Sequence, residues 1–265
     1  MVAAVVSNAR VAVVGDNTVD RYLGGPEYVG GNALNVAVQL RLQGVTATYF
    51  GAVGADADGR EIAGALRRHG VGTTGLVTAD GPTAVTEIRV TPEGDRVFVR
   101  EDFGVTADYR PSDAELALIA GHDWVHIGML PRAAEAVTRL RAVAPGIRIS
   151  QDCAVSSGYA GLDVAFCSTG EDIAAARRAA DDALSAGAAL AVVTRGAAGA
   201  FASDGRRSWR CAALPVDVVD TTGAGDSFIA GFIAARLART PVRGALEAGA
   251  RVAARTCGHL GGFPQ

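Results

Sequence analysis

The chain has 265 residues, of which 49% are hydrophobic and 20% are charged, so it can bury a sizeable core and is not a disordered protein. Its formal net charge of −3 argues against a nucleic-acid-binding protein, which would carry a basic stripe. No uncharged apolar run approaches the roughly 20 residues of a membrane span, and residues 1–8 lack the basic start of a signal peptide. We therefore expect a cytoplasmic α/β protein, with residues 1–265 in one domain.

The N-terminal part of the chain begins with a strand and a short acidic loop. Residues 11–14 form a continuous apolar run, which is typical of a buried parallel strand. Gly15, Asp16 and Asn17 follow at its carboxyl end, which is the edge where open α/β sheets bind ligands. From its position alone, Asp16 can simply accept hydrogen bonds from amides of the loop.

The second glycine motif is Gly30-Gly31-Asn32-Ala33-Leu34-Asn35, which opens a helix that we expect to run to about Gln43 and to stop at Gly44. Asn32 has a residue type that favours capping the start of this helix. Asn35 lies one turn further along, on the same side of the helix, where capping does not require an asparagine.

The next part of the chain predicts a strand, a helix and then a hairpin. Residues 49–53 read as a core strand and residues 60–69 as a helix. Residues 83–90 and 96–101 alternate apolar and polar side chains around a turn at 92–95, which is typical of an antiparallel hairpin with one exposed face. Together with residues 22–29, this hairpin is expected to form a small sheet beside the main one.

The middle of the chain alternates helical and strand patterns. The predicted helices span residues 114–119, 132–141 and 171–185, and the predicted strands span residues 124–127, 147–150, 164–167 and 190–194. Regular alternation of this kind predicts a parallel sheet with helices on both faces. His126 lies in one of these strands and is expected to be a structural histidine.

Near the C-terminus a strand-like segment, residues 213–219, leads into Asp220-Thr221-Thr222-Gly223-Ala224-Gly225-Asp226-Ser227-Phe228 and then a helical run to residue 237. The glycines let backbone amides at the start of that helix approach an anion such as phosphate. Asp226 beside those amides can be a helix cap, or it can be a base that takes a proton from a hydroxyl group while the amides hold a phosphoryl group. Pro241 starts a last helix that extends to residue 256.

The C-terminal motif resembles the signature of the ribokinase-like (PfkB) carbohydrate kinases, and the Gly30–Asn35 motif resembles the N-terminal signature of the same family. The resemblance implies a ribokinase-like α/β fold, in which a parallel sheet is flanked by helices and a small β-sheet forms a lid. It implies that Asp226 is the catalytic base. The implied anion hole consists of the backbone of Gly223, Ala224 and Gly225, and the residues implied to bind the acceptor sugar are Asp16, Gly31 and Asn35.

The same resemblance implies ATP and Mg²⁺ as cofactors. The family usually has Asn-x-x-Glu after one of the middle strands; here Ser168 replaces the asparagine, while Glu171 matches and would act on metal-bound water. Thr194 and Gly196 resemble a Thr-x-Gly motif that contacts ATP, although a plain turn is an equal alternative. The resemblance also allows a monovalent cation, such as K⁺, near Asp220.

Within the family, the pattern is nearest to that of the fructoselysine 6-kinases. The implied partner is therefore a small-molecule sugar or glycated amino acid, with no nucleic acid and no membrane. Residues 20–30 and 83–101 would form the lid, through which the family often makes a homodimer. Two alternatives stay open: a kinase for fructose, ribose or a nucleoside, and a sugar-binding regulator that has lost turnover.

Overall fold

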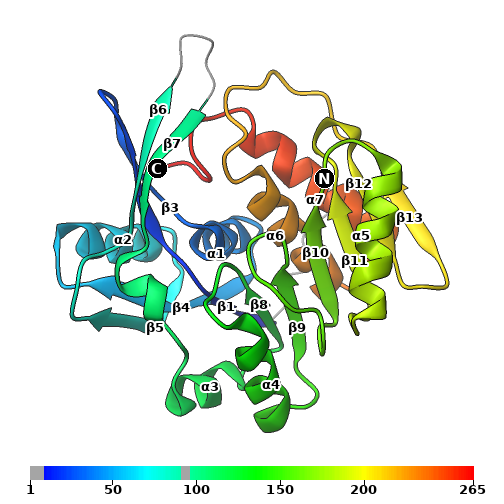
Figure 1. Ribbon diagram of the computed structural model, residues 1–265, viewed down its shortest axis with the longest axis horizontal. Coiled ribbons are helices and arrows are strands. Elements are labelled where there is room, and N and C mark those ends of the chain that lie inside the picture. The colour runs from blue at the N-terminus through cyan, green and yellow to red at the C-terminus, as the bar shows by residue number, and fades with distance from the viewer. Residues whose placement is uncertain (1–8, 91–95) are drawn as a thin grey trace.

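The structure is a computed structural model that describes residues 9–90 and 96–265, and it contains two β-sheets (Figure 1). The larger sheet has nine strands in the order β13-β12-β11-β10-β9-β8-β1-β4-β5. These strands are β1 (Arg10–Val14), β4 (Thr46–Gly54), β5 (Gly72–Ala79), β8 (Trp124–Ile127), β9 (Arg148–Asp152), β10 (Val164–Ser168), β11 (Ala191–Thr194), β12 (Ala200–Ser203) and β13 (Ser208–Cys211). All neighbouring pairs from β5 to β11 are parallel, as the alternating pattern predicts.

Helices cover both faces of this sheet, as expected. One face carries α1 (Asn32–Leu42), α2 (Ala57–Arg68), α6 (Ala224–Leu237) and α7 (Val242–Thr256), and the other carries α3 (Asp113–Ile119), α4 (Ala133–Val143) and α5 (Ile173–Ser185). The central strand β1 serves both cores, because its side chains alternate between faces. Val11 and Val13 pack into the first core, while Ala12 and Val14 pack into the second.

The structure differs from the sequence prediction at both edges of the main sheet. The edge strand β5 was not predicted, and the opposite edge differs as well. β12 and β13 form an antiparallel hairpin there, which the sequence analysis did not predict. Residues 213–219, which were predicted to be strand-like, belong to neither sheet. Their alternating apolar pattern suits a strand, but no neighbouring strand pairs with them, and Val218 is 61% exposed.

The smaller sheet has the strand order β3-β2-β6-β7. Its strands are β2 (Thr18–Tyr22), β3 (Glu27–Gly30), β6 (Val85–Val90) and β7 (Arg96–Asp102). This confirms the predicted small sheet, although the predicted turn at 92–95 lies outside the described residues. Figure 1 shows β6 and β7 standing away from the main sheet, on the side where β2 and β3 lead into α1. In the part of the chain that the structure describes, no helix is both long and apolar enough to cross a membrane.

Candidate active site

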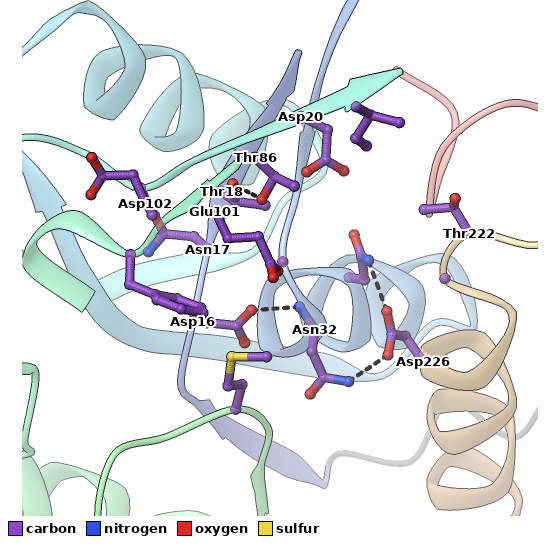
Figure 2. A pocket seen from close by; sticks show the side chains of 17 residues that line it. Asp16, Asn17, Thr18, Asp20, Asn32, Thr86, Glu101, Asp102, Thr222 and Asp226 are labelled. Atoms are coloured by element: carbon purple, nitrogen blue, oxygen red, sulfur yellow. Dashed lines mark hydrogen bonds between the residues drawn. The ribbon is translucent and has the colours of Figure 1, made fainter. Parts of the chain in front are cut away.

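A cavity of about 200 Å³ lies between the small sheet, the carboxyl end of β1 and the N-terminal ends of α1 and α6 (Figure 2). Its lining is strongly acidic. The acidic lining residues are Asp16, Asp20, Glu101, Asp102 and Asp226. Among the described residues that line the cavity, none is an arginine, lysine or histidine. The cavity therefore suits a neutral or positively charged ligand with hydroxyl groups.

Asp226 is buried in the first turn of α6, and both of its carboxylate oxygens accept hydrogen bonds from α1 (Figure 2). Asn32 Nδ2 donates to Asp226 Oδ1 at 2.7 Å, and Asn35 Nδ2 donates to Asp226 Oδ2 at 2.8 Å. These two amides fix the carboxylate of Asp226, which is also one of the residues that line the cavity. Asp226 is therefore not the cap of α6, since Gly223 holds the N-cap position and the Asp226 carboxylate is bonded to α1 instead.

The pKa of Asp226 is raised well above its ordinary value. Burial is the main cause, because it disfavours the charged form, and the negative charges of Asp152 and Asp16 raise the pKa further. The hydrogen bonds from Asn35 and Asn32 act in the opposite direction, since they stabilise the carboxylate. A carboxylate with a raised pKa is a stronger base than an exposed one, as general base catalysis near neutral pH requires.

Asn32 is placed differently from the sequence prediction. The N-cap of α1 is Gly31, at a φ of 111°, and Asn32 is the first helical residue. Its side chain is thereby free to join two acids, because Asn32 Nδ2 donates to Asp152 Oδ2 at 2.8 Å as well as to Asp226. Sequence reasoning missed Asp152, which ends β9 and is buried with a raised pKa. Its only sequence signal is its place at the carboxyl end of a strand.

Asp16 accepts hydrogen bonds from backbone amides at the start of α1, which is the structural role that its position alone allowed. Its Oδ2 accepts from the amide of Asn32 at 2.8 Å, and its Oδ1 accepts from the amide of Ala33 at 2.9 Å. Burial nevertheless raises the pKa of Asp16 to about 6, against the effect of these amides. Because each carboxylate oxygen can accept more than one bond, Asp16 can still receive a ligand hydroxyl at the cavity wall.

Gly31 lets α1 approach the loop after β1. A Cβ at Gly31 would lie 2.5 Å from the Cα of Asn17, so only glycine fits there. The side-chain amide of Asn17 is buried, and its Nδ2 donates to Tyr49 Oη and to the carbonyl oxygen of Ala52. Three amide oxygens at this wall are buried without a partner among the described residues, namely those of Asn17, Asn32 and Asn35. Unpaired buried acceptors are costly, and such groups are uncommon in folded proteins outside functional sites.

The N-terminus of α6 faces open space. Gly223 precedes the helix in the left-handed conformation, at a φ of 69°, and no side chain caps the first turn. A Cβ at Gly225 would meet no atom of the described residues within 4 Å, so none of them fills the space beside Gly225. Uncapped amides beside open space, at the positive end of a helix dipole, fit an anion such as a phosphate group.

Asp220 lies at the start of the same loop and is only 4% exposed. Asp220 Oδ1 accepts from the amide of Thr222 at 2.7 Å, and Asp220 Oδ2 accepts from the amide of Gly261 at 2.8 Å. These bonds hold the loop against the C-terminal segment. The Asp220 carboxylate therefore has a structural role.

The remaining predicted residues gather at a second position, at the carboxyl ends of β10 and β11. Ser168 and Thr194 are register partners there, and the amide of Thr169 donates to the carbonyl oxygen of Thr194 at 3.0 Å. Gly196 follows in a left-handed conformation, with open space beside it. The carbonyl oxygen of Glu171 accepts a hydrogen bond from Arg195. None of the predicted residues at this position lines the cavity at Asp226.

Comparison with known proteins identifies the family of this chain. The model of the "pfkB family carbohydrate kinase" matches residues 9–145 and 160–263. The chain belongs to the pfkB family of carbohydrate kinases. The family establishes a kinase that uses ATP with Mg²⁺. The described residues offer no group of three or more His, Cys, Asp or Glu side chains placed to hold a metal ion.

Relatives within the family cover nearly the whole chain. The fructosamine kinase FrlD of Bacillus subtilis (strain 168) is 31% identical over 96% of this chain and 93% of its own. The fructoselysine 6-kinase of Escherichia coli (strain K12) is 34% identical over 96% of this chain and 99% of its own. The fold is similar to that of Arabidopsis thaliana ribokinase complexed with ribose and ATP, with a TM-score of 0.87 and 19% identity over 98% of this chain and 96% of the ribokinase. The ribokinase-like fold is thereby confirmed.

Proposed function

We propose that this kinase phosphorylates the terminal 6-hydroxyl of a fructosamine, with fructoselysine as the expected substrate. The observation that carries the proposal is the position of Asp226. It is a buried carboxylate, held by two asparagine amides, where an acidic cavity meets the uncapped start of α6. A sugar hydroxyl in the cavity and a phosphate at the helix start would meet at this carboxylate.

In the proposed mechanism, the sugar lies between the loop after β1 and the start of α1. Asp16 and Asn35 accept hydrogen bonds from its hydroxyls, and Gly31 forms the cavity wall between them. Asp226 then accepts the proton of the reacting hydroxyl as that oxygen attacks the terminal phosphorus of ATP, and ADP leaves. The raised pKa of Asp226 matches this role, because a stronger base takes the proton more readily.

The proposed anion hole stabilises the charge on the transferred phosphoryl group. The backbone of Gly223, Ala224 and Gly225 would surround that group without a side chain between. Mg²⁺, when bound, would neutralise charge on the phosphate oxygens. Glu171 is proposed to orient its water ligands, and Ser168, Thr194 and Gly196 to contact the nucleotide, since they share the strand ends beside α5.

The small sheet is proposed to be the lid over the sugar. Thr18 and Asp20 on β2 and Thr86 on β6 line the cavity together with the end of β7. The substrate part of the proposal is supported by the two relatives, which are named as kinases of fructosamine and fructoselysine. The acidity of the cavity also agrees with an amine-bearing sugar.

An assay that couples ADP release to a detectable product, run over fructoselysine, fructose, ribose and adenosine, tests this proposal. We expect kcat/KM to be highest for fructoselysine, with the product phosphorylated at C6 by NMR. Equal or better turnover of plain fructose or ribose would contradict fructoselysine as the substrate, but it would not contradict the kinase activity. ATP binding without ADP release from any acceptor would instead indicate the regulator that has lost turnover.

Three further expectations belong to this proposal. A monovalent cation near Asp220 and Thr222 would offset the buried charge of Asp220, and a rate in K⁺ equal to that in tetramethylammonium would contradict it.

Dimerisation through the lid is testable by light scattering, in which a monomer at assay concentration is the contrary result. A cytoplasmic location agrees with a supply of ATP and is testable by fractionation of the source cells.

A further inference from the structure

The two faces of the small sheet carry different charges. In the β6–β7 pair, Thr86 lies opposite Glu101 and Glu87 lies opposite Arg100. Because side chains alternate along a strand, the two pairs point to opposite faces. Thr86 and Glu101 line the cavity at Asp226, whereas Glu87 and Arg100 line a separate cavity on the other face. The lid therefore presents a carboxylate to the substrate and turns its arginine away.

Glu101 also differs from Asp102, Asp226 and Asp16 in the contacts that its carboxylate makes. Asp102, beside it, is paired with Arg100 at 2.9 Å and accepts from the amide of Gly104 at 3.1 Å. Asp226 and Asp16 are held by the amides of α1. Among the described residues, no hydrogen bond or ion pair engages the Glu101 carboxylate. Nor do the described acids converge as a metal site, since no group of three is placed for one.

A fructosamine carries its charge at the end remote from the reacting hydroxyl. The 6-hydroxyl must reach Asp226, and the secondary amine sits on C1, at the opposite end of the sugar. Figure 2 shows Asp226 and Glu101 on opposite sides of the cavity, Asp226 from α6 and Glu101 from β7, with the Glu101 side chain directed inward. Near neutral pH the secondary amine is protonated, so it can donate a charge-assisted hydrogen bond to a carboxylate.

We infer that Glu101 is the specificity residue that binds the protonated secondary amine joining the sugar to its amino acid. This inference rests on the proposed function and names the group that distinguishes a fructosamine from a plain sugar. Arg100 does not contribute to this wall, because it lines the cavity on the other face of the small sheet. Glu101 binds the positive charge of the amine on C1, and the α-carboxylate of the amino acid extends beyond the acidic wall.

The test compares Glu101→Gln with Glu87→Gln, which makes the same change on the neighbouring strand but on the opposite face. Glu101→Gln should lower kcat/KM for fructoselysine by about tenfold, since a hydrogen bond between charged groups is lost from a partly open site. It should leave kcat/KM for fructose within about twofold, because fructose has no amine. Glu87→Gln should leave both values unchanged. An equal loss for both sugars in Glu101→Gln, or no loss, would overturn the inference.

A neutral substrate analogue gives a second measurement, which can be made on the wild-type enzyme as well as on Glu101→Gln. In it, an ether oxygen replaces the secondary amine between C1 and the amino-acid side chain. The wild-type enzyme should use this ether about tenfold less well than fructoselysine, and Glu101→Gln should use both about equally. If the wild type phosphorylates neither, the proposed function fails as well. If it phosphorylates both equally well, only the role of Glu101 fails.

Discussion

Asp226 is only 8% exposed, yet its proposed role requires its charged form. The asparagines of α1 reconcile these demands, because their amides stabilise the carboxylate from two sides. Asp226→Asn should therefore retain ATP binding while kcat falls by a factor on the order of 10²–10⁴, the usual contribution of a positioned base. Turnover within tenfold of wild type, measured by ADP release, would exclude the role.

The same variant should be more stable than the wild type. A carboxyl whose folded pKa is raised destabilises the fold increasingly as pH rises from its unfolded value, about 4, through its folded value, because the buried group must then be charged. Asparagine removes this cost, and the unpaired oxygens of Asn32 and Asn35 can turn to accept its amide. The Tm of Asp226→Asn should exceed that of the wild type at pH 8, and the difference should shrink toward pH 4. A difference that grows on acidification would contradict this account.

The pH dependence of the rate tests the asparagine contacts directly. Activity requires deprotonated Asp226, so kcat/KM should fall on acidification at a higher pH than an exposed aspartate would give. Asn35→Ala removes a hydrogen bond that lowers this pKa, so the acid limb should move to still higher pH. Gln39→Ala is the matched control, since Gln39 lies one turn further along α1 and donates to Gly262 and Thr256 instead. A shift of equal size in both variants would indicate a general effect of loosening α1.

At the scale of elements, α6 combines a start that is open to a ligand with a middle that is closely packed against α7. Gly225 faces empty space, whereas a Cβ at Gly231, in the same helix, would lie 2.7 Å from a side-chain carbon of Val252 in α7. The two glycines thus serve different purposes: one admits a phosphate and the other admits a neighbouring helix.

Alanine at the two positions should separate these purposes. Gly225→Ala should fold with nearly unchanged Tm, while its methyl group occupies the phosphate space and lowers kcat/KM for ATP by about tenfold or more. Gly231→Ala should instead lose about 1–3 kcal/mol of unfolding free energy through overpacking of α6 against α7. Thermal unfolding and ATP kinetics of both variants provide the check, and equal kinetic damage from both would refute the distinction.

At the scale of the whole molecule, the site joins the small sheet to the main sheet, so a bound substrate should stabilise them together. For a ligand that binds only the folded state, a concentration of 100 Kd adds about 2.7 kcal/mol to the unfolding free energy. Inactive Asp226→Asn with Mg²⁺-ATP should therefore show a higher Tm when saturated with fructoselysine. Fructose at the same concentration should give a smaller rise, and an equal rise from fructose would argue against recognition of the amine.

The sequence alone determined the α/β class, the small sheet, and the two glycine motifs that supply Gly31, Asn35 and Asp226 to one cavity. These features depend on local patterns, namely hydrophobic periodicity and the chemistry of strand ends and helix starts. The same reasoning failed at residues 213–219, because a strand needs a pairing partner as well as an apolar pattern.

Only the tertiary structure decided which polar groups surround Asp226. Asn32 has the residue type of a helix cap, but Gly31 takes the cap position and leaves the Asn32 amide to reach Asp226, 194 positions away in the sequence. Asp152 joins the same cluster from the end of β9. The face of Glu101 likewise depends on strand register, since a shift of one residue would turn Arg100 inward instead. Contacts between distant segments and the register of paired strands leave no local pattern, and the packing of the folded chain sets them.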